Sequence, residues 1–72
     1  MDSYYLVTTA AADRSNYSSL AEAQLALGAQ LQLQVARGFN NHRNPSGRFM
    51  SRRPESAVVM LWIEDDDGQV CS

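Results

Sequence analysis

A chain of 72 residues is about half the length of a typical single domain, so it predicts one domain over residues 1–72 and excludes a multidomain enzyme. Hydrophobic residues make up 44% of the chain and charged residues 19%, a balance that excludes an intrinsically disordered protein. One cysteine and one histidine exclude an internal disulfide and a Cys/His zinc site, so we expect neither metal nor cofactor. A core this small also disfavours catalysis.

Nothing in the chain has the pattern of a secretory signal or a membrane span. The longest apolar run, Ala57 to Ile63, is far shorter than the roughly 20 residues that cross a bilayer. We therefore expect a soluble, intracellular protein.

The N-terminal third predicts a strand followed by a loop. Tyr4 to Thr9 combines aromatic, β-branched and apolar residues, which is typical of a strand. Ala10 to Tyr17 contains Asp13, Ser15 and Asn16, whose side chains favour turns, so this segment predicts a connecting loop.

A helix is predicted to begin after Ser19. The segment Ser19-Leu20-Ala21-Glu22 matches a capping box, in which the Ser19 hydroxyl accepts from the Glu22 N–H and the carboxylate returns to the Ser19 N–H. The residues up to Val35 are mostly Ala, Leu and Gln, and Gly38 after them predicts a left-handed helix end.

The same residues allow a second interpretation. From Leu25 to Val35 apolar residues alternate strictly with others, which is the period of a strand. In that interpretation the helix ends near Gly28 and a strand runs from about Gln30 to Arg37. We favour the long helix because of its composition and its end signal.

The C-terminal half predicts a long loop followed by a hairpin. Asn, Pro and Gly residues predict that residues 38–56 are mostly an arginine-rich loop, within which Arg48 to Arg52 is a candidate short edge strand. Ala57 to Ile63 is apolar on both faces, so we expect it at the centre of the sheet with Trp62 in the core. If Trp62 faces outward, it is instead an interface anchor. Asp67-Gly68 predicts a tight turn and a brief return strand. The fold class is α+β, with one helix packed on a small, mostly antiparallel sheet in the order β-α-β-β.

Charge is strongly segregated along the chain although the formal net charge is only −2. The segment Arg37 to Arg53 holds five arginines and no acid, whereas the remainder holds eight acids and Arg14. A guanidinium is a planar fork of donors that suits carboxylates, phosphates and stacked rings, so we predict contact with a partner rather than a merely solvated surface. The candidate partner-binding residues are Arg37, Phe39, Arg43, Arg48, Phe49, Arg52 and Arg53.

Two classes of partner suit this segment. Aromatic residues among arginines can stack bases while the cations contact phosphates, which favours nucleic acid. The net negative charge disfavours a broad contact with a polyanion. An acidic protein surface that touches only the loop avoids that repulsion.

The predicted helix has apolar residues on two sides. One stripe, which should face the sheet, contains Leu20, Ala23, Leu27, Leu31 and Val35. On the opposite side Leu25, Ala29 and Leu33 form a possible face for a partner or a second copy. The alternative is a helix covered by the arginine loop, with Phe39 or Phe49 over Leu33.

The remaining titratable residues predict no chemistry. The acids from Glu64 to Asp67 lack the spacing of a calcium loop and predict a structural turn. We expect His42 to be a surface residue, because no catalytic constellation surrounds it. Cys71 is expected to be incidental.

Three segments in this order, Tyr4-Tyr5-Leu6-Val7, then Ser19 to Ala23, then Val58 to Ile63 followed by Glu64 to Gly68, together with the small, lysine-free acidic chain, resemble small phage-encoded anti-CRISPR proteins that inhibit type I systems. The resemblance is one of size and element order over most of the chain, and it carries no site residue.

This resemblance implies a non-enzymatic phage inhibitor in the cytoplasm of a bacterial host. Such an inhibitor binds a CRISPR effector complex, here through the arginine-rich loop, and blocks target DNA binding or nuclease recruitment. The alternatives are a small nucleic-acid-binding or regulatory module that uses Arg37 to Arg53, and a homodimeric structural protein that pairs through the second helix face.

Overall fold

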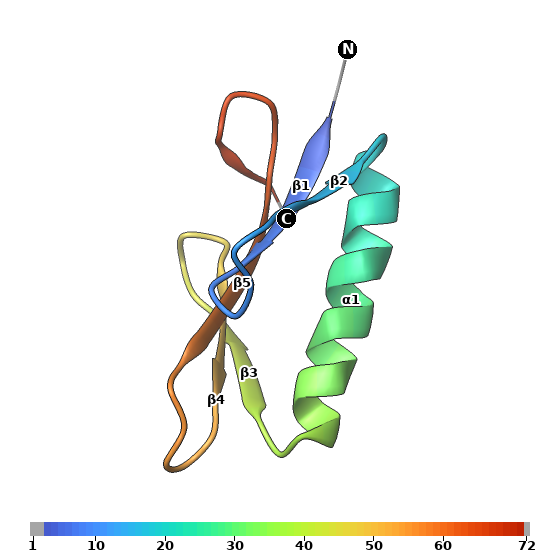
Figure 1. Ribbon diagram of the computed structural model, residues 1–72. Helices are drawn as coiled ribbons and strands as arrows, with labels where there is room; N and C mark the ends of the chain where they lie inside the picture. The colour runs from blue at the N-terminus through green and yellow to red at the C-terminus, as the bar shows by residue number, and fades with distance from the viewer. Residues whose placement is uncertain (1–2, 72) are drawn as a thin grey trace.

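The computed structural model describes residues 3–71, in which one helix packs on one face of a six-stranded sheet (Figure 1). The strand order is β2-β1-β5-β4-β3, with β6 paired to β5, and every pair is antiparallel. The α+β class is therefore confirmed. The elements are β1 (Tyr4–Thr8), β2 (Ser15–Tyr17), α1 (Leu20–Ala36), β3 (Asn40–Arg43), β4 (Phe49–Arg52), β5 (Val59–Glu64) and β6 (Val70–Cys71).

The predicted order β-α-β-β was too short, because both predicted loops contain strands. Strand β2 lies within the expected loop at 10–17, and β3 and β4 lie within the expected loop at 38–56. The predicted strand around Arg48 to Arg52 exists as β4, but it lies between β5 and β3 and is not at the edge.

The turn between β3 and β4 explains why the arginine-rich segment is not a loop. The Asn44 N–H donates to the carbonyl of Arg48 at 2.9 Å, and the Asn44 side-chain oxygen accepts from the backbone N–H groups of Ser46 and Arg48. Gly47 adopts the left-handed conformation, with φ of 87°, that closes the turn. Only the five residues 44–48 separate the two strands, and the residues on either side pair as β3 and β4.

Helix α1 has the predicted extent, so the interpretation of residues 30–37 as a strand is wrong. At its start the Ser19 Oγ accepts from the Glu22 N–H at 3.1 Å as predicted. The Glu22 carboxylate does not complete the capping box; it accepts instead from the Ser18 hydroxyl at 3.2 Å. At its end Gly38 has φ of 87° and donates to the Val35 carbonyl, the left-handed termination that its position predicted.

The core lies between α1 and the centre of the sheet. Its buried residues are Leu6 on β1, Ala23 and Leu27 on α1, and Leu61 and Ile63 on β5. Strand β5 is central as predicted. Full burial of a Leu or Ile side chain contributes about 1.5–3 kcal/mol, so β5 and the first half of α1 contain the main stabilising contacts. None of the helices within residues 3–71 has the length and apolar character that crossing a membrane requires.

The buried face of α1 differs from the predicted stripe in its last turn. Val35 is 60% exposed, whereas Gln34 is only 7% exposed. Gln34 points at the sheet because its Nε2 donates to the Oγ of the buried Ser51 at 3.2 Å. A polar pair therefore closes the core at this end, where the pattern of apolar residues predicted Val35.

Removal of only one partner of this hydrogen bond should lower the free energy of unfolding more than removal of both partners. Gln34→Ala leaves the buried Ser51 hydroxyl without its donor, and we expect the free energy of unfolding to fall by about 1–3 kcal/mol. The double variant Gln34→Leu with Ser51→Ala should recover most of that loss, because neither partner is then unsatisfied. Urea denaturation followed by circular dichroism measures both, with the exposed Gln32→Ala as the control at about 0.5 kcal/mol or less. Equal losses for Gln34→Ala and Gln32→Ala would show that the buried pair does not stabilise the fold.

Candidate macromolecule-binding face

The sheet has a second face that α1 does not cover (Figure 1). Because successive residues of a strand point to opposite faces, the residues next to the buried ones along each strand point away from the helix. On this face Val7 lies opposite Trp62 and Met50 lies opposite Met60. We call it the open face, and its residues are Tyr5, Val7, Arg14, His42, Arg48, Met50, Arg52, Met60, Trp62 and Glu64.

Trp62 lies at the centre of the open face. The prediction that it is in the core was wrong. The guanidinium carbon of Arg48 lies 5.0 Å from the centre of the Trp62 ring. The indole Nε1 donates to Glu64 Oε1 at 2.9 Å. Apolar residues on both faces of β5 indicated a strand covered on both sides, but the one helix covers only one side. Trp62 is therefore covered by an arginine side chain and remains half-buried.

Tyr5 carries the same arrangement on the neighbouring strand. The guanidinium carbon of Arg14 lies 4.5 Å from the centre of the Tyr5 ring, and its NH1 atom lies 3.2 Å from Glu64 Oε2. Glu64 thus joins the two ring sites through its two oxygens. The Arg14 side chain is 51% exposed, so solvent screens this ion pair and it contributes about 1 kcal/mol at most.

The open face has a positive local charge although the chain is acidic. Glu64 is the one carboxylate among its described residues, and that carboxylate is already bonded to Trp62 and Arg14. Arg48 and Arg52 have no carboxylate partner within residues 3–71. The face therefore offers guanidinium donors beside aromatic and apolar side chains.

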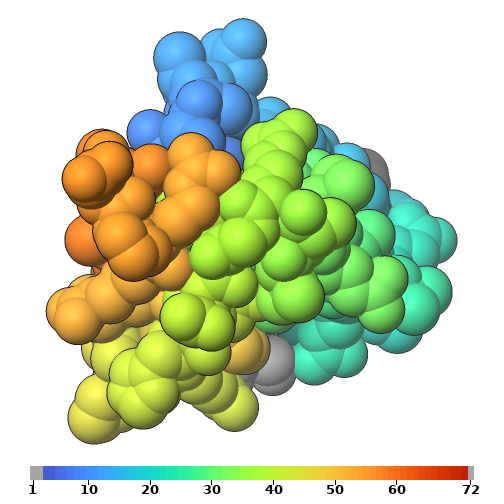
Figure 2. Space-filling view, turned by 90° about the horizontal axis from the view of Figure 1, so that it is seen from below, coloured from blue at the N-terminus to red at the C-terminus, as the bar shows by residue number. Residues whose placement is uncertain are grey.

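The structure separates the two neighbouring arginines that the sequence grouped together. Arg52 is exposed on the open face, at the register position opposite Asn40. Arg53 instead donates from NH1 to the carbonyl of Arg37 at 2.7 Å, donates from Nε and NH2 to Ser56 Oγ, and covers the Phe39 ring at 4.7 Å. In Figure 2 the connection between β4 and β5 (orange) lies beside the end of α1 and the start of β3 (green to yellow-green). Arg53 therefore fastens this connection to the helix end.

The predicted aromatic anchors lie on the helix side of the sheet. Phe39 is buried beneath Arg53, and Phe49 packs against the core with the guanidinium carbon of Arg43 5.9 Å from its ring. Arg37 is exposed at the end of α1, on the side away from the open face. The structure thus brings Arg48 and Arg52 together on one face and places the other predicted contact residues elsewhere.

The second apolar side of α1 is exposed. Leu25 is 77% exposed, and Ala29 and Leu33 are exposed as well. The interpretation in which Phe39 or Phe49 covers Leu33 is therefore wrong. Pairing of this surface with a second copy stays a prediction.

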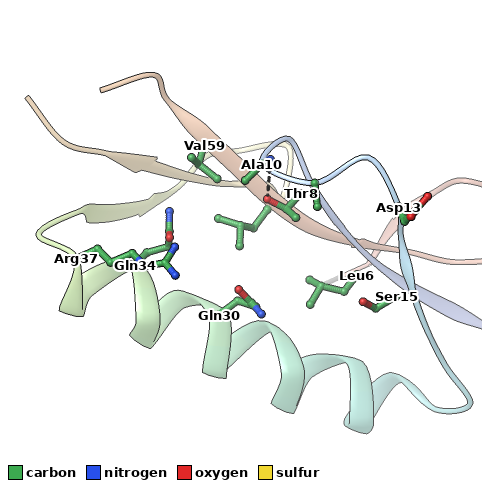
Figure 3. A pocket seen from close by; sticks show the side chains of 11 residues that line it. Leu6, Thr8, Ala10, Asp13, Ser15, Gln30, Gln34, Arg37 and Val59 are labelled. Carbon is green, nitrogen blue, oxygen red and sulfur yellow. Dashed lines mark hydrogen bonds between the residues drawn. The ribbon is translucent and has the colours of Figure 1, made fainter. Parts of the chain in front are cut away.

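A small cleft separates the second half of α1 from β1. It encloses about 220 Å³, and Gln30 and Gln34 extend into it from the helix while Leu6 and Val59 face them from the sheet (Figure 3). Arg37 lies at one end.

The acidic segment forms the predicted turn. Asp65 Oδ1 accepts from the backbone N–H groups of Asp67 and Gln69, and Gly68 has φ of 79° at the tight position. Within residues 3–71 the His, Cys, Asp and Glu side chains form no cluster suited to a metal ion. Partial burial, and then the nearby Asp65 carboxylate, raise the pKa of the Cys71 thiol above its ordinary 9.0, so the thiol remains protonated at neutral pH. His42 is exposed as expected.

Comparison with known proteins adds no functional residue. No protein-family model, no curated protein and no solved structure matches the chain. The geometry of the open face is therefore the main indication of function.

Sequence reasoning missed Tyr5, Arg14 and Glu64 as candidate site residues, and it favoured the core over the surface for Trp62. The signal that could have found them is the apolar content of both faces of the predicted strands, combined with the prediction of only one helix. One helix covers one face of a sheet, so the apolar residues of the other face need another cover.

The two neighbouring arginines should respond differently to substitution. Arg53→Ala removes the bonds to the Arg37 carbonyl and to Ser56, and we expect the free energy of unfolding to fall by about 1 kcal/mol. Arg52→Ala should change it by about 0.5 kcal/mol or less, because Arg52 makes no such contact. Urea denaturation of both variants measures the difference. Equal effects would contradict the assignment of Arg53 to the fold and of Arg52 to the surface.

Proposed function

We propose that this protein acts by binding another macromolecule through the open face, without catalysis. The observation that carries the proposal is the pair of rings, Trp62 and Tyr5, each stacked with a guanidinium on a sheet face that no described helix covers. Trp, Tyr and Arg are the residues that most often dominate binding energy in protein interfaces.

Burial of the apolar residues around the rings would contribute favourably to the free energy of binding. Val7, Met50 and Met60 are half-buried on the open face, and their exposed area is apolar. Removal of such area from water contributes about 25 cal/mol per Å². The exposed guanidiniums of Arg14 and Arg52 add charge and orientation at the edges.

Inhibition of a CRISPR effector complex, the function that the resemblance implies, would be one case of this activity. A small protein that docks on an acidic face of such a complex blocks that face by occupancy alone. The basic hairpin, residues 40–52, contributes Arg48 and Arg52 to the open face, which supports a role for the arginine-rich segment in docking.

A comparison of immobilised variants in a bacterial lysate tests the proposal. The bait proteins are the wild type, an open-face variant with Met60→Ser and Arg52→Ala, and a helix-face control with Leu33→Ser. We expect the wild type and the control to retain the same macromolecule, and the open-face variant to lose at least nine-tenths of it. Mass spectrometry detects protein, and absorbance after extraction detects nucleic acid.

Circular dichroism confirms that each bait is folded before the comparison. Retention that is lost with Leu33→Ser and kept by the open-face variant would assign binding to the helix instead. Retention equal to that of empty beads would contradict the proposed function.

A further inference from the structure

We propose that the partner of the open face is single-stranded nucleic acid, with bases stacked at Trp62 and Tyr5 and phosphates contacted by Arg14, Arg48 and Arg52. This inference rests on the proposed function, since it names the partner of the same face. It requires planar stacking surfaces, cations beside them and little negative charge nearby, and the described residues meet all three conditions.

In the structure, planar guanidinium groups already lie over both aromatic rings. The Arg48 guanidinium lies over Trp62 at 5.0 Å, and the Arg14 guanidinium lies over Tyr5 at 4.5 Å. A base has a flat π surface of the same kind, and bases stack on aromatic rings and on guanidinium planes alike. Each arginine can therefore remain between ring and base or move aside toward a phosphate.

The two ring sites are close enough to serve one strand. Tyr5 lies opposite Glu64 on β5, two residues from Trp62, so the two rings are diagonal neighbours on adjacent strands. Diagonal neighbours lie about 7–8 Å apart. The hydrogen bond from the Trp62 indole to Glu64 and the Glu64–Arg14 ion pair hold the two sites in one network.

The cations flank the rings on both sides. Arg14 immediately precedes β2, at one edge of the open face. On the other side of β5, Arg48 immediately precedes β4 and Arg52 is the last residue of β4. A strand that crosses the sheet between them has phosphates within reach of either group. Guanidinium is suited to phosphate because its fork of donors matches two oxygens at once.

Two acids lie near this path. The Glu64 carboxylate already accepts from Trp62 and Arg14, and Asp13 lines the cleft on the helix side of the sheet. The other described acidic residues lie away from it. Asp65, Asp66 and Asp67 form the turn after β5, and Glu55 lies in the turn between β4 and β5, at the opposite end of the sheet. Glu22 is at the start of α1, on the other side of the molecule. The net charge of −2 thus describes the whole chain and not the open face.

The shape of the face favours nucleic acid over an acidic protein. A protein partner is typically anchored by a side chain that fills a pocket. Two cavities among the described residues lie away from the open face, one between α1 and β1 and the other beside the acidic turn. A sheet face with half-buried rings instead offers planar surfaces that suit flat ligands, and stacking on such surfaces has little sequence preference.

Fluorescence anisotropy of labelled 12-nucleotide DNA and RNA, single-stranded and duplex, tests the inference. For the single strands we expect a Kd on the order of 1–100 µM at 0.15 M salt, the range of non-specific binding. Three phosphate contacts predict a slope of log K against log salt of about −2, or a roughly 20-fold loss of affinity between 50 and 200 mM salt. Duplexes should bind at least fivefold more weakly, because their bases are not free to stack.

A matched pair of substitutions tests the stacking. Trp62→Leu keeps an apolar side chain but removes the ring, and we expect at least a tenfold loss of affinity for single strands. Trp62→Phe keeps a ring and should remain within about threefold of the wild type. Circular dichroism shows whether both variants are folded, and an equal effect of the two would overturn base stacking at this position.

A second pair of variants tests whether binding occurs on the open face. Each variant removes one positive charge. Arg52→Ala should weaken binding about threefold to tenfold and reduce the salt slope by about 0.7, the share of one phosphate on a single strand. Arg37→Ala, on the other side of the molecule, should remain within about twofold. Equal losses for the two would show that the attraction is general and would overturn the assignment to the open face.

Other results separate this inference from the proposed function. Absence of any anisotropy change at 50 mM salt with 1 mM protein overturns nucleic acid as the partner. Capture of a protein by the open face that survives nuclease treatment overturns it too, but leaves the proposed function intact. A dimer in light scattering that Trp62→Leu dissociates shows that a second copy occupies the face, which again overturns the inference.

Discussion

The structure depends on one constraint, which is that a single 17-residue helix covers only one face of the sheet. The face beneath α1 forms the core around Leu61 and Ile63. The other face carries apolar and aromatic side chains that the chain has no second layer to bury. Its own arginines cover the two rings in part, because a guanidinium can lie flat on an aromatic ring while its edges remain in water. The fold is therefore stable, while the rings on that face remain partly accessible to a partner.

The arginines divide into two groups by what they contact. Arg53 bonds to the Arg37 carbonyl and covers Phe39, so it stabilises the connection between β4 and β5 at the end of the helix. Arg14 and Arg48 lie over rings of the open face, and Arg52 is exposed beside them. The segregation of charge in the sequence therefore does not correspond to one flexible cationic loop. The segment instead contains a structural arginine, Arg53, and the surface arginines Arg48 and Arg52, which Arg14 joins from a distant part of the chain.

The sequence predicted the elements whose local signals agree with their surroundings. The start of α1 at Ser19, its end at Gly38, the central position of β5 and the turn at Gly68 all follow from short-range chemistry. Strands β2 and β3 could not be predicted in this way, since they are polar and pair only because the neighbouring strand is present. Gln34 in place of Val35 in the core depends on the position of Ser51, which is far away in the sequence. The candidate site could not be predicted as a unit, because Tyr5, Arg14 and Trp62 meet only through the order of the strands.

The central claim is that the open face of the sheet, and not the helix or the cleft beneath it, is the surface that binds. The most direct measurement is a series of ¹H–¹⁵N NMR spectra of the protein during titration with a single-stranded oligonucleotide. The account predicts that the Trp62 indole N–H and the Arg14 and Arg48 Nε–H signals shift together, while the amide signals of Leu25 and Leu33 on α1 do not move. Shifts confined to α1 or to the lining of the cleft, or none at saturating oligonucleotide, would contradict it.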